Sequence, residues 1–215
     1  MEALGEAGAA RRRGAKPAIG RGEARMRAFA YLTGVTIGLI DGVLAVHIWS
    51  LGFTGQVAIL IASLSLPCLL SALAVPRVSA RVGRRVPSCV GAACLAVGSI
   101  VIASAVALAP GEPTAGLFSL VAFALGYALL GLGYGVLWSL LPLIAHELSL
   151  RGHERLVPRA NSLLGVGGGL GIVLGLLHGG GPQLPAVALV ALALSLLVVA
   201  SLLPESPSWY AAKGR

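Results

Sequence analysis

Apolar residues in this 215-residue chain gather in six long stretches, separated by short connections. The stretches lie near residues 28–50, 56–76, 88–109, 117–145, 162–178 and 184–203. About 20 apolar residues in a helix cross the hydrocarbon core of a bilayer. The pattern therefore predicts an all-α, polytopic membrane protein with six transmembrane helices, in which the short connections make neighbouring helices antiparallel.

The fourth stretch is longer than one upright transmembrane helix needs. At a rise of about 1.5 Å per residue, residues 115–148 would form a helix of about 50 Å, whereas the hydrocarbon core is about 30 Å thick. We expect this helix to tilt, to extend beyond the core or to begin late.

The basic residues fall in alternate segments between the apolar stretches. All 16 Lys and Arg residues lie in residues 11–27, 77–85, 151–159 and 213–215, and the connections at 51–55, 110–116 and 179–183 contain none. Cytosolic loops carry an excess of Lys and Arg, so the pattern predicts an integral multi-pass protein with both termini cytosolic. We divide the chain into a basic cytosolic tail at 1–27, predicted to be disordered, a six-helix transmembrane bundle at 28–204 and a cytosolic C-terminal segment at 205–215.

Composition excludes several classes of protein. The chain is 57% hydrophobic and 11% charged, with a mean hydropathy of +0.90, whereas soluble domains carry about 25% charged residues. The net charge of +8 reflects topology and contact with anionic lipid, and it indicates no nucleic-acid partner. The chain has no metalloprotease, nucleophile-elbow or P-loop motif and no Cys/His cluster, so we predict no enzymatic activity, no cofactor and no metal.

Glycine recurs at every fourth residue in three of the stretches. The longest series is Gly167, Gly171, Gly175 and Gly179, and shorter ones are Gly34, Gly38 and Gly42, and Gly131 and Gly135. Such series let helix backbones approach closely in a membrane. They indicate either packing within the bundle or, for one series, an interface between subunits.

One acidic residue, Asp41, lies near the middle of a predicted span. Ionisable groups at that depth are costly and commonly functional, which indicates a protonatable or substrate-binding site. The alternative is a protonated carboxyl bonded to a neighbouring helix. Tyr127, Tyr134 and Trp138 share one face of the fourth span, where they either line a solute cavity with Asp41 or simply pack.

Charged residues of both signs gather at the ends of the spans that are predicted to be cytosolic. We expect either a charge network or separate solvated charges among Arg81, Arg84, Arg85, Glu147, Arg159 and Glu205. Bidentate Arg–carboxylate pairs are the strong form of such contacts.

Three motifs resemble those of the major facilitator superfamily. Arg81, Gly83, Arg84 and Arg85 match its signature between helices 2 and 3, and Ala80 stands where that signature has an Asp. The segment Pro204-Glu205-Ser206-Pro207-Ser208-Trp209-Tyr210 is similar to the motif that closes helix 6 of sugar porters. Pro142-Leu-Ile-Ala-His-Glu147 is similar to the end of helix 4 in the same branch.

The resemblance implies one six-helix half of such a transporter, nearest to the N-terminal half, with two three-helix repeats of inverted topology. It implies secondary-active transport of a small organic solute, with sugar-like cargo preferred, and a network that closes the cytosolic side. At three positions where sugar porters have an Asp, an Arg and a Gln, this chain has Ile40, Tyr127 and Gly167.

A single six-helix half supplies one wall of a cavity that normally has two. The resemblance therefore implies a homodimer or a complex with a related half-transporter, for which we expect the glycine series of the fifth span at the seam. The alternative is a truncated or non-transporting membrane protein that binds or regulates a full-length relative.

Overall fold

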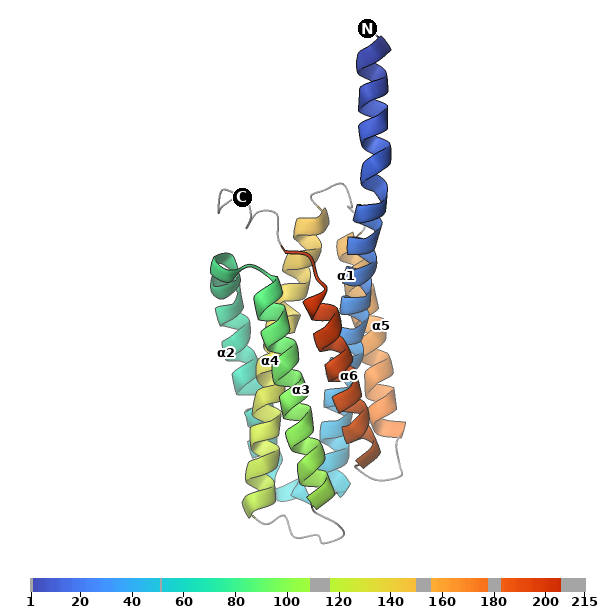
Figure 1. Ribbon diagram of the computed structural model, residues 1–215. Helices are drawn as coiled ribbons and strands as arrows, with labels where there is room; N and C mark the ends of the chain where they lie inside the picture. The colour runs from blue at the N-terminus through green and yellow to red at the C-terminus, as the bar shows by residue number, and fades with distance from the viewer. Residues whose placement is uncertain (1, 51, 109–116, 150–155, 178–182, 206–215) are drawn as a thin grey trace.

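The computed structural model describes residues 2–50, 52–108, 117–149, 156–177 and 183–205, with side chains described from Gly22 onwards and not at 148 and 149. These residues form six α-helices and one short 3₁₀-helix, η1, arranged as a bundle (Figure 1). The elements are α1 (Glu2–Ser50), η1 (Phe53–Gln56), α2 (Val57–Val82), α3 (Arg85–Leu108), α4 (Leu117–Ser149), α5 (Leu156–Leu177) and α6 (Gln183–Ser201). The prediction of an all-α, polytopic membrane protein is confirmed.

Within the described part of the chain, six segments are long and apolar enough to cross a membrane. They are Gly22–Ser50, Phe53–Val82, Arg85–Leu108, Leu117–Glu147, Leu156–Leu177 and Gln183–Ser201. Each contains most of one stretch that the hydrophobic pattern predicted. The longest stretch forms the 33-residue helix α4, which at about 1.5 Å per residue is about 50 Å long and so exceeds the bilayer core.

Helix α1 begins at Glu2, whereas the sequence predicted a disordered tail up to residue 27. Ala, Glu and Arg predominate before Gly14, and these residues have high helix propensity. They continue the helical backbone of the span beyond the end of the bundle (Figure 1).

Helix α2 continues through Pro76 to Val82, although the sequence predicted that the span ends near residue 76. Proline has no N–H to donate to the carbonyl four residues earlier, here the carbonyl of Ala72. The Ser139 hydroxyl of α4 lies 3.5 Å from that carbonyl oxygen and donates to it instead. The neighbouring helix thus replaces part of the bond that Pro76 removes.

The packing pairs repeat within the chain. Helix α1 packs on α5 and α6, α4 packs on α2 and α3, and α3 packs on α6. If α1, α2 and α3 are exchanged with α4, α5 and α6, the pair α1–α5 becomes α4–α2 and the pair α3–α4 becomes α6–α1. This correspondence is what two related three-helix units would produce.

Glycine residues lie where the helices of the two corresponding pairs, α1–α5 and α4–α2, come closest to each other. A Cβ atom on Gly38 or Gly171 would collide with backbone across the α1–α5 contact, at Gly168 and Val35 respectively. On α4, a Cβ on Gly131 or Gly135 would collide with backbone carbonyls of α2. These helices approach so closely because no side chain separates their backbones.

Candidate functional site

A cavity of about 580 Å³ lies on one face of the bundle, between α1, α4 and α5. Helix α1 contributes Gly34, Ile37, Gly38 and Asp41, α4 contributes Tyr134, Trp138 and Pro142, and α5 contributes Asn161, Leu164, Gly165, Gly168, Gly169 and Ile172. On each helix these residues follow one another by three or four positions, or are direct neighbours, so they form one face. The hydrophobic pattern predicted the helices. The rotation of each helix about its axis in the bundle brings these three faces together around the cavity.

Asp41 is exposed to the cavity rather than buried between helices. It follows Ile37 by four residues and Gly38 by three, so it lies in the same lining face of α1. Within the described residues, the structure gives Asp41 no ion-pair partner. The side chain therefore lies where a molecule in the cavity could reach it.

Tyr134 and Trp138 lie one helical turn apart on α4 and line the cavity together with Asp41. Their ring centroids are 6.0 Å apart, with an angle of 53° between the ring planes. Trp138 is 50% exposed, so the chain itself leaves this face of the cavity open. Two of the three aromatic residues that the sequence selected thus line the cavity.

Tyr127, the third aromatic residue of that predicted face, lies outside the cavity. It is fully buried, and its hydroxyl lies 2.9 Å from Nδ1 of His47 on α1. Phe123 packs edge-on against His47, and Phe53 packs against Phe123. Tyr127 shares its direction on α4 with Tyr134, but it lies two turns away along the helix, where His47 of α1 contacts it.

Asn161 is a cavity residue that the sequence analysis did not select. It is exposed at the beginning of α5 and precedes Gly165 by four residues and Gly168 by seven. The sequence could have indicated this residue, because Asn161 is an amide on the same helical face as Gly165 and Gly168, next to an apolar span. Its position adds a hydrogen-bond donor and an acceptor to the cavity wall.

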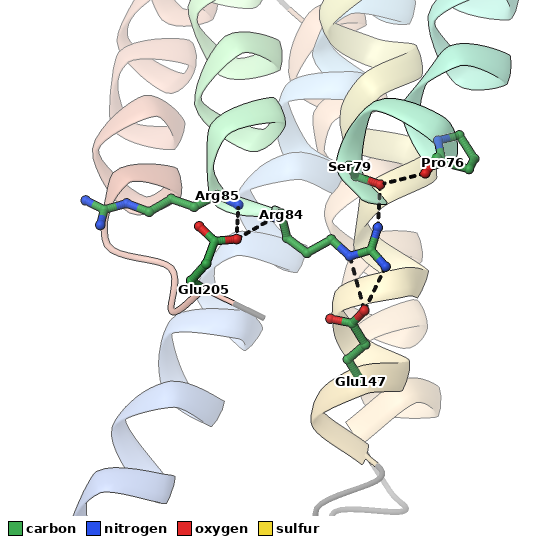
Figure 2. Close-up of polar contacts among 6 residues, drawn as sticks. All are labelled: Pro76, Ser79, Arg84, Arg85, Glu147 and Glu205. Carbon is green, nitrogen blue, oxygen red and sulfur yellow. Dashed lines mark hydrogen bonds and ion pairs between the residues drawn. The ribbon is translucent and has the colours of Figure 1, made fainter. Parts of the chain in front are cut away.

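Arg84, in the connection between α2 and α3, forms a two-point contact with the end of α4 (Figure 2). Its Nη2 and Nε donate to Oε1 of Glu147 at 2.7 and 3.2 Å, and Nη1 donates to the Ser79 hydroxyl. Both charged side chains are mostly buried, with exposures of 17% and 19%. The contact therefore holds the α2–α3 connection against α4 more firmly than a solvated pair would.

Glu205 binds backbone rather than an arginine side chain in these contacts. Its Oε1 accepts hydrogen bonds from the backbone N–H groups of Arg84 at 2.5 Å and Arg85 at 3.2 Å, at the beginning of α3 (Figure 2). Helix N-termini present unsatisfied N–H groups and a positive dipole end, which favour a carboxylate. Gly83, with φ of 89°, leaves room for this carboxylate, because a Cβ atom there would collide with it.

The side chains of Arg85 and Arg159 lie apart from these contacts. Arg159 lies 3.7 Å from Glu23 of α1 rather than beside Glu147 or Glu205. The Arg85 side chain points away from Glu205 (Figure 2), and Arg81 is exposed. Arg25 of α1 donates to the backbone carbonyl of Leu202 at 3.1 Å. The arginines of this end therefore link α1 to α5 and to the end of α6, and the α2–α3 connection to α4.

The glycine series of α5 is used inside the chain. Gly167, Gly171 and Gly175 are buried against α1, at Tyr31, Val35 and Gly42 respectively. They form a helix-packing face, and this contact occupies the face that we expected at a subunit seam. Gly179 lies outside the described residues.

The comparisons with known proteins agree with this architecture. A family model described as Sugar (and other) transporter matches residues 21–215. No curated protein and no solved structure matched the chain. Because the match covers nearly all of the sequence, and the six helices correspond to one half of a major facilitator transporter, the chain belongs to the Sugar (and other) transporter family.

Proposed function

We propose that this chain forms one half of a secondary-active transporter for a small organic solute, and that Asp41, Tyr134 and Trp138 contact the solute. The observation that carries the proposal is the cavity of about 580 Å³ with an acid from the middle of a span in its wall. Ligand pockets commonly have volumes of about 300–1,000 Å³. Membership of a transporter family supports the same activity.

The second wall of the cavity comes, in this proposal, from a second copy of the chain or from a related half. Trp138 is 50% exposed and Asp41 is exposed, and a lone bundle would leave both facing lipid. Exposure of an acid to lipid is unfavourable, and alternating access requires two bundles that move about a shared site. The partner half therefore covers the face that carries the cavity.

The contacts of Arg84 with Glu147, and of Glu205 with the beginning of α3, act in this proposal as a gate on the cytosolic side. They join the ends of α2, α3, α4 and α6, at the end of the bundle where Arg25 contacts Leu202. Opening the cavity toward the cytosol separates these ends. Arg81, Arg85 and Arg159 add positive charge at this end of the bundle.

Labelling of a cysteine in the cavity tests the transport activity without knowledge of the solute. Gly169 lines the cavity, and a Cβ atom there meets nothing within 4 Å. We would introduce Gly169→Cys after replacing Cys68, Cys89 and Cys94 by alanine, and apply a membrane-impermeant thiol reagent to each side of sealed vesicles. We expect labelling from both sides, because the cavity opens to each side in turn.

The matched control is Leu194→Cys on α6, which is exposed but does not line the cavity, and we expect it to stay unlabelled. Single-molecule subunit counting in bilayers tests the partner half, with two copies expected. Labelling of Gly169→Cys from one side only, together with a monomeric protein, would contradict the proposal and favour a non-transporting membrane protein that regulates a full-length relative.

A further inference from the structure

We propose that the cavity between α1, α4 and α5 takes a small organic cation, with Asp41 as the counter-charge and Tyr134 and Trp138 as its aromatic contacts. This inference rests on the proposed function and names the class of solute. It departs from the sugar-like cargo that the sequence resemblance implies, and it follows from the chemistry of the lining residues.

The charge of the cavity wall has one sign. Among the described residues that line it, Asp41 is the ionisable acid, and none is a Lys, Arg or His. A carboxylate at this depth is unfavourable without a positive partner. An ammonium group on the solute would supply that partner, whereas a neutral or anionic solute would leave the carboxylate uncompensated or repelled.

The aromatic side chains complement a cation of this kind. Tyr134 and Trp138 line the same cavity as Asp41, and their ring planes are inclined at 53° with centroids 6.0 Å apart. An ammonium group within about 6 Å of the face of a Trp or Tyr ring is attracted by its quadrupole. Two inclined rings and one acid in the same cavity therefore suit a cation that also carries apolar groups.

The wall that this chain supplies offers a sugar few hydrogen-bond partners. Besides Asp41, the polar side-chain groups on the described lining are those of Tyr134, Trp138 and Asn161, and the other lining residues are glycine or apolar. A sugar presents several hydroxyl groups, and each one that enters an apolar wall without a partner is unfavourable by about 1–3 kcal/mol. An alkylated ammonium group has no hydroxyl groups that would need hydrogen-bond partners in the wall.

Choline and its neutral isostere 3,3-dimethylbutan-1-ol provide a matched pair of probes that differ in charge but hardly in shape. We would measure equilibrium binding of both, and of glucose, to the full chain in lipid nanodiscs. We expect choline to bind at least about tenfold more tightly than the isostere, and glucose to bind no better than the isostere. Trp138→Leu should weaken choline binding by about 2- to 30-fold, the range of cation–π contributions.

Two variants of Asp41 distinguish the effect of its charge on binding from the effect of its shape. Asp41→Asn should reduce the preference for choline over the isostere to about one while leaving isostere binding unchanged, and Asp41→Glu should retain a preference. Retention of isostere binding shows that Asp41→Asn is folded. Equal binding of choline and its isostere to the wild type, tighter binding of glucose, or a preference that survives Asp41→Asn would each overturn the proposal.

The cysteine-labelling experiment keeps this inference distinct from the proposed function. If choline fails to bind preferentially while Gly169→Cys is labelled from both sides, the class of solute is wrong and transport stands. If choline binds through Asp41 while labelling is confined to one side, the cation site stands and the transport cycle does not.

Discussion

At the scale of single residues, Glu147 and Glu205 carry the same side chain but are held by different chemistry. Glu147 accepts from the guanidinium of Arg84, and Glu205 accepts from two backbone N–H groups at the start of α3. The sequence predicted that both carboxyl groups lie near the arginines, because opposite charges at the same ends of neighbouring helices attract each other. It could not show that one of them would bind backbone, because that depends on where α3 begins relative to the end of α6.

This difference predicts unequal effects of removing each arginine. Arg84→Ala removes the two-point bond to a largely buried carboxylate and should lower the free energy of unfolding by about 1.5–3 kcal/mol. Arg85→Ala should have little effect, because Glu205 binds the backbone of Arg85. Glu205→Ala should lower the free energy of unfolding by about 0.3–2 kcal/mol, because it removes a carboxylate from the N-terminus of α3. Thermal unfolding of the purified variants measures all three, and equal losses for Arg84→Ala and Arg85→Ala would contradict this assignment.

Tyr127 gives a second prediction, since it lies in the core and not in the cavity. Tyr127→Phe removes the hydroxyl that bonds to His47 and should destabilise the protein by about 0.6–2 kcal/mol, the range for hydrogen bonds between membrane helices. Choline binding should not change, whereas Tyr134→Leu should weaken it. Unfolding and binding measurements on the same two variants test this, and weakened binding by Tyr127→Phe would place that residue in the site after all.

At the scale of helices, hydrophobic pattern predicted the number and approximate bounds of the spans, because the bilayer fixes the length of a crossing helix. It did not predict which glycine series meet. Gly34, Gly38 and Gly42 of α1 cross the series of α5 within one chain, and Gly131 and Gly135 of α4 cross glycine-poor α2. The rotation and tilt of each helix decide these pairings, and a single sequence records neither.

The two faces of α5 predict opposite responses to the same substitution. Gly171→Ala places a Cβ atom against the Val35 carbonyl oxygen and should destabilise the bundle by about 1–3 kcal/mol or more through overpacking. Gly169→Ala meets nothing within 4 Å and should be neutral or stabilising by up to about 1 kcal/mol through helix propensity. Unfolding of each variant in detergent tests this. A similar loss for both would contradict this difference between the two faces, because the cavity leaves room for a Cβ atom on Gly169.

At the scale of the whole molecule, the contacts at one end of the bundle bear on its orientation. Arg25 near the start of the first span bonds to Leu202 after α6, so the chain enters and leaves the bundle at the same end, as an even number of crossings requires. Arg84, Arg85 and Arg159 lie at this end as well. The sequence could predict this arrangement because charge alternates from one connection to the next, a signal that needs no knowledge of packing.

The orientation itself is the last prediction. Positively charged segments next to transmembrane helices remain in the cytosol, so the end with Arg25 and Arg84 should face the cytosol and η1 should lie on the opposite side. Reporter fusions at Thr54, Pro113 and Gly180 should therefore read as external, and a fusion after Arg215 should read as cytosolic. External signals at both Thr54 and Arg215 would contradict an even number of crossings. An internal signal at Thr54 together with an external one at Arg215 would show that the protein has the opposite orientation. The contacts of Arg84 and Glu205 would then close the outer side of the cavity.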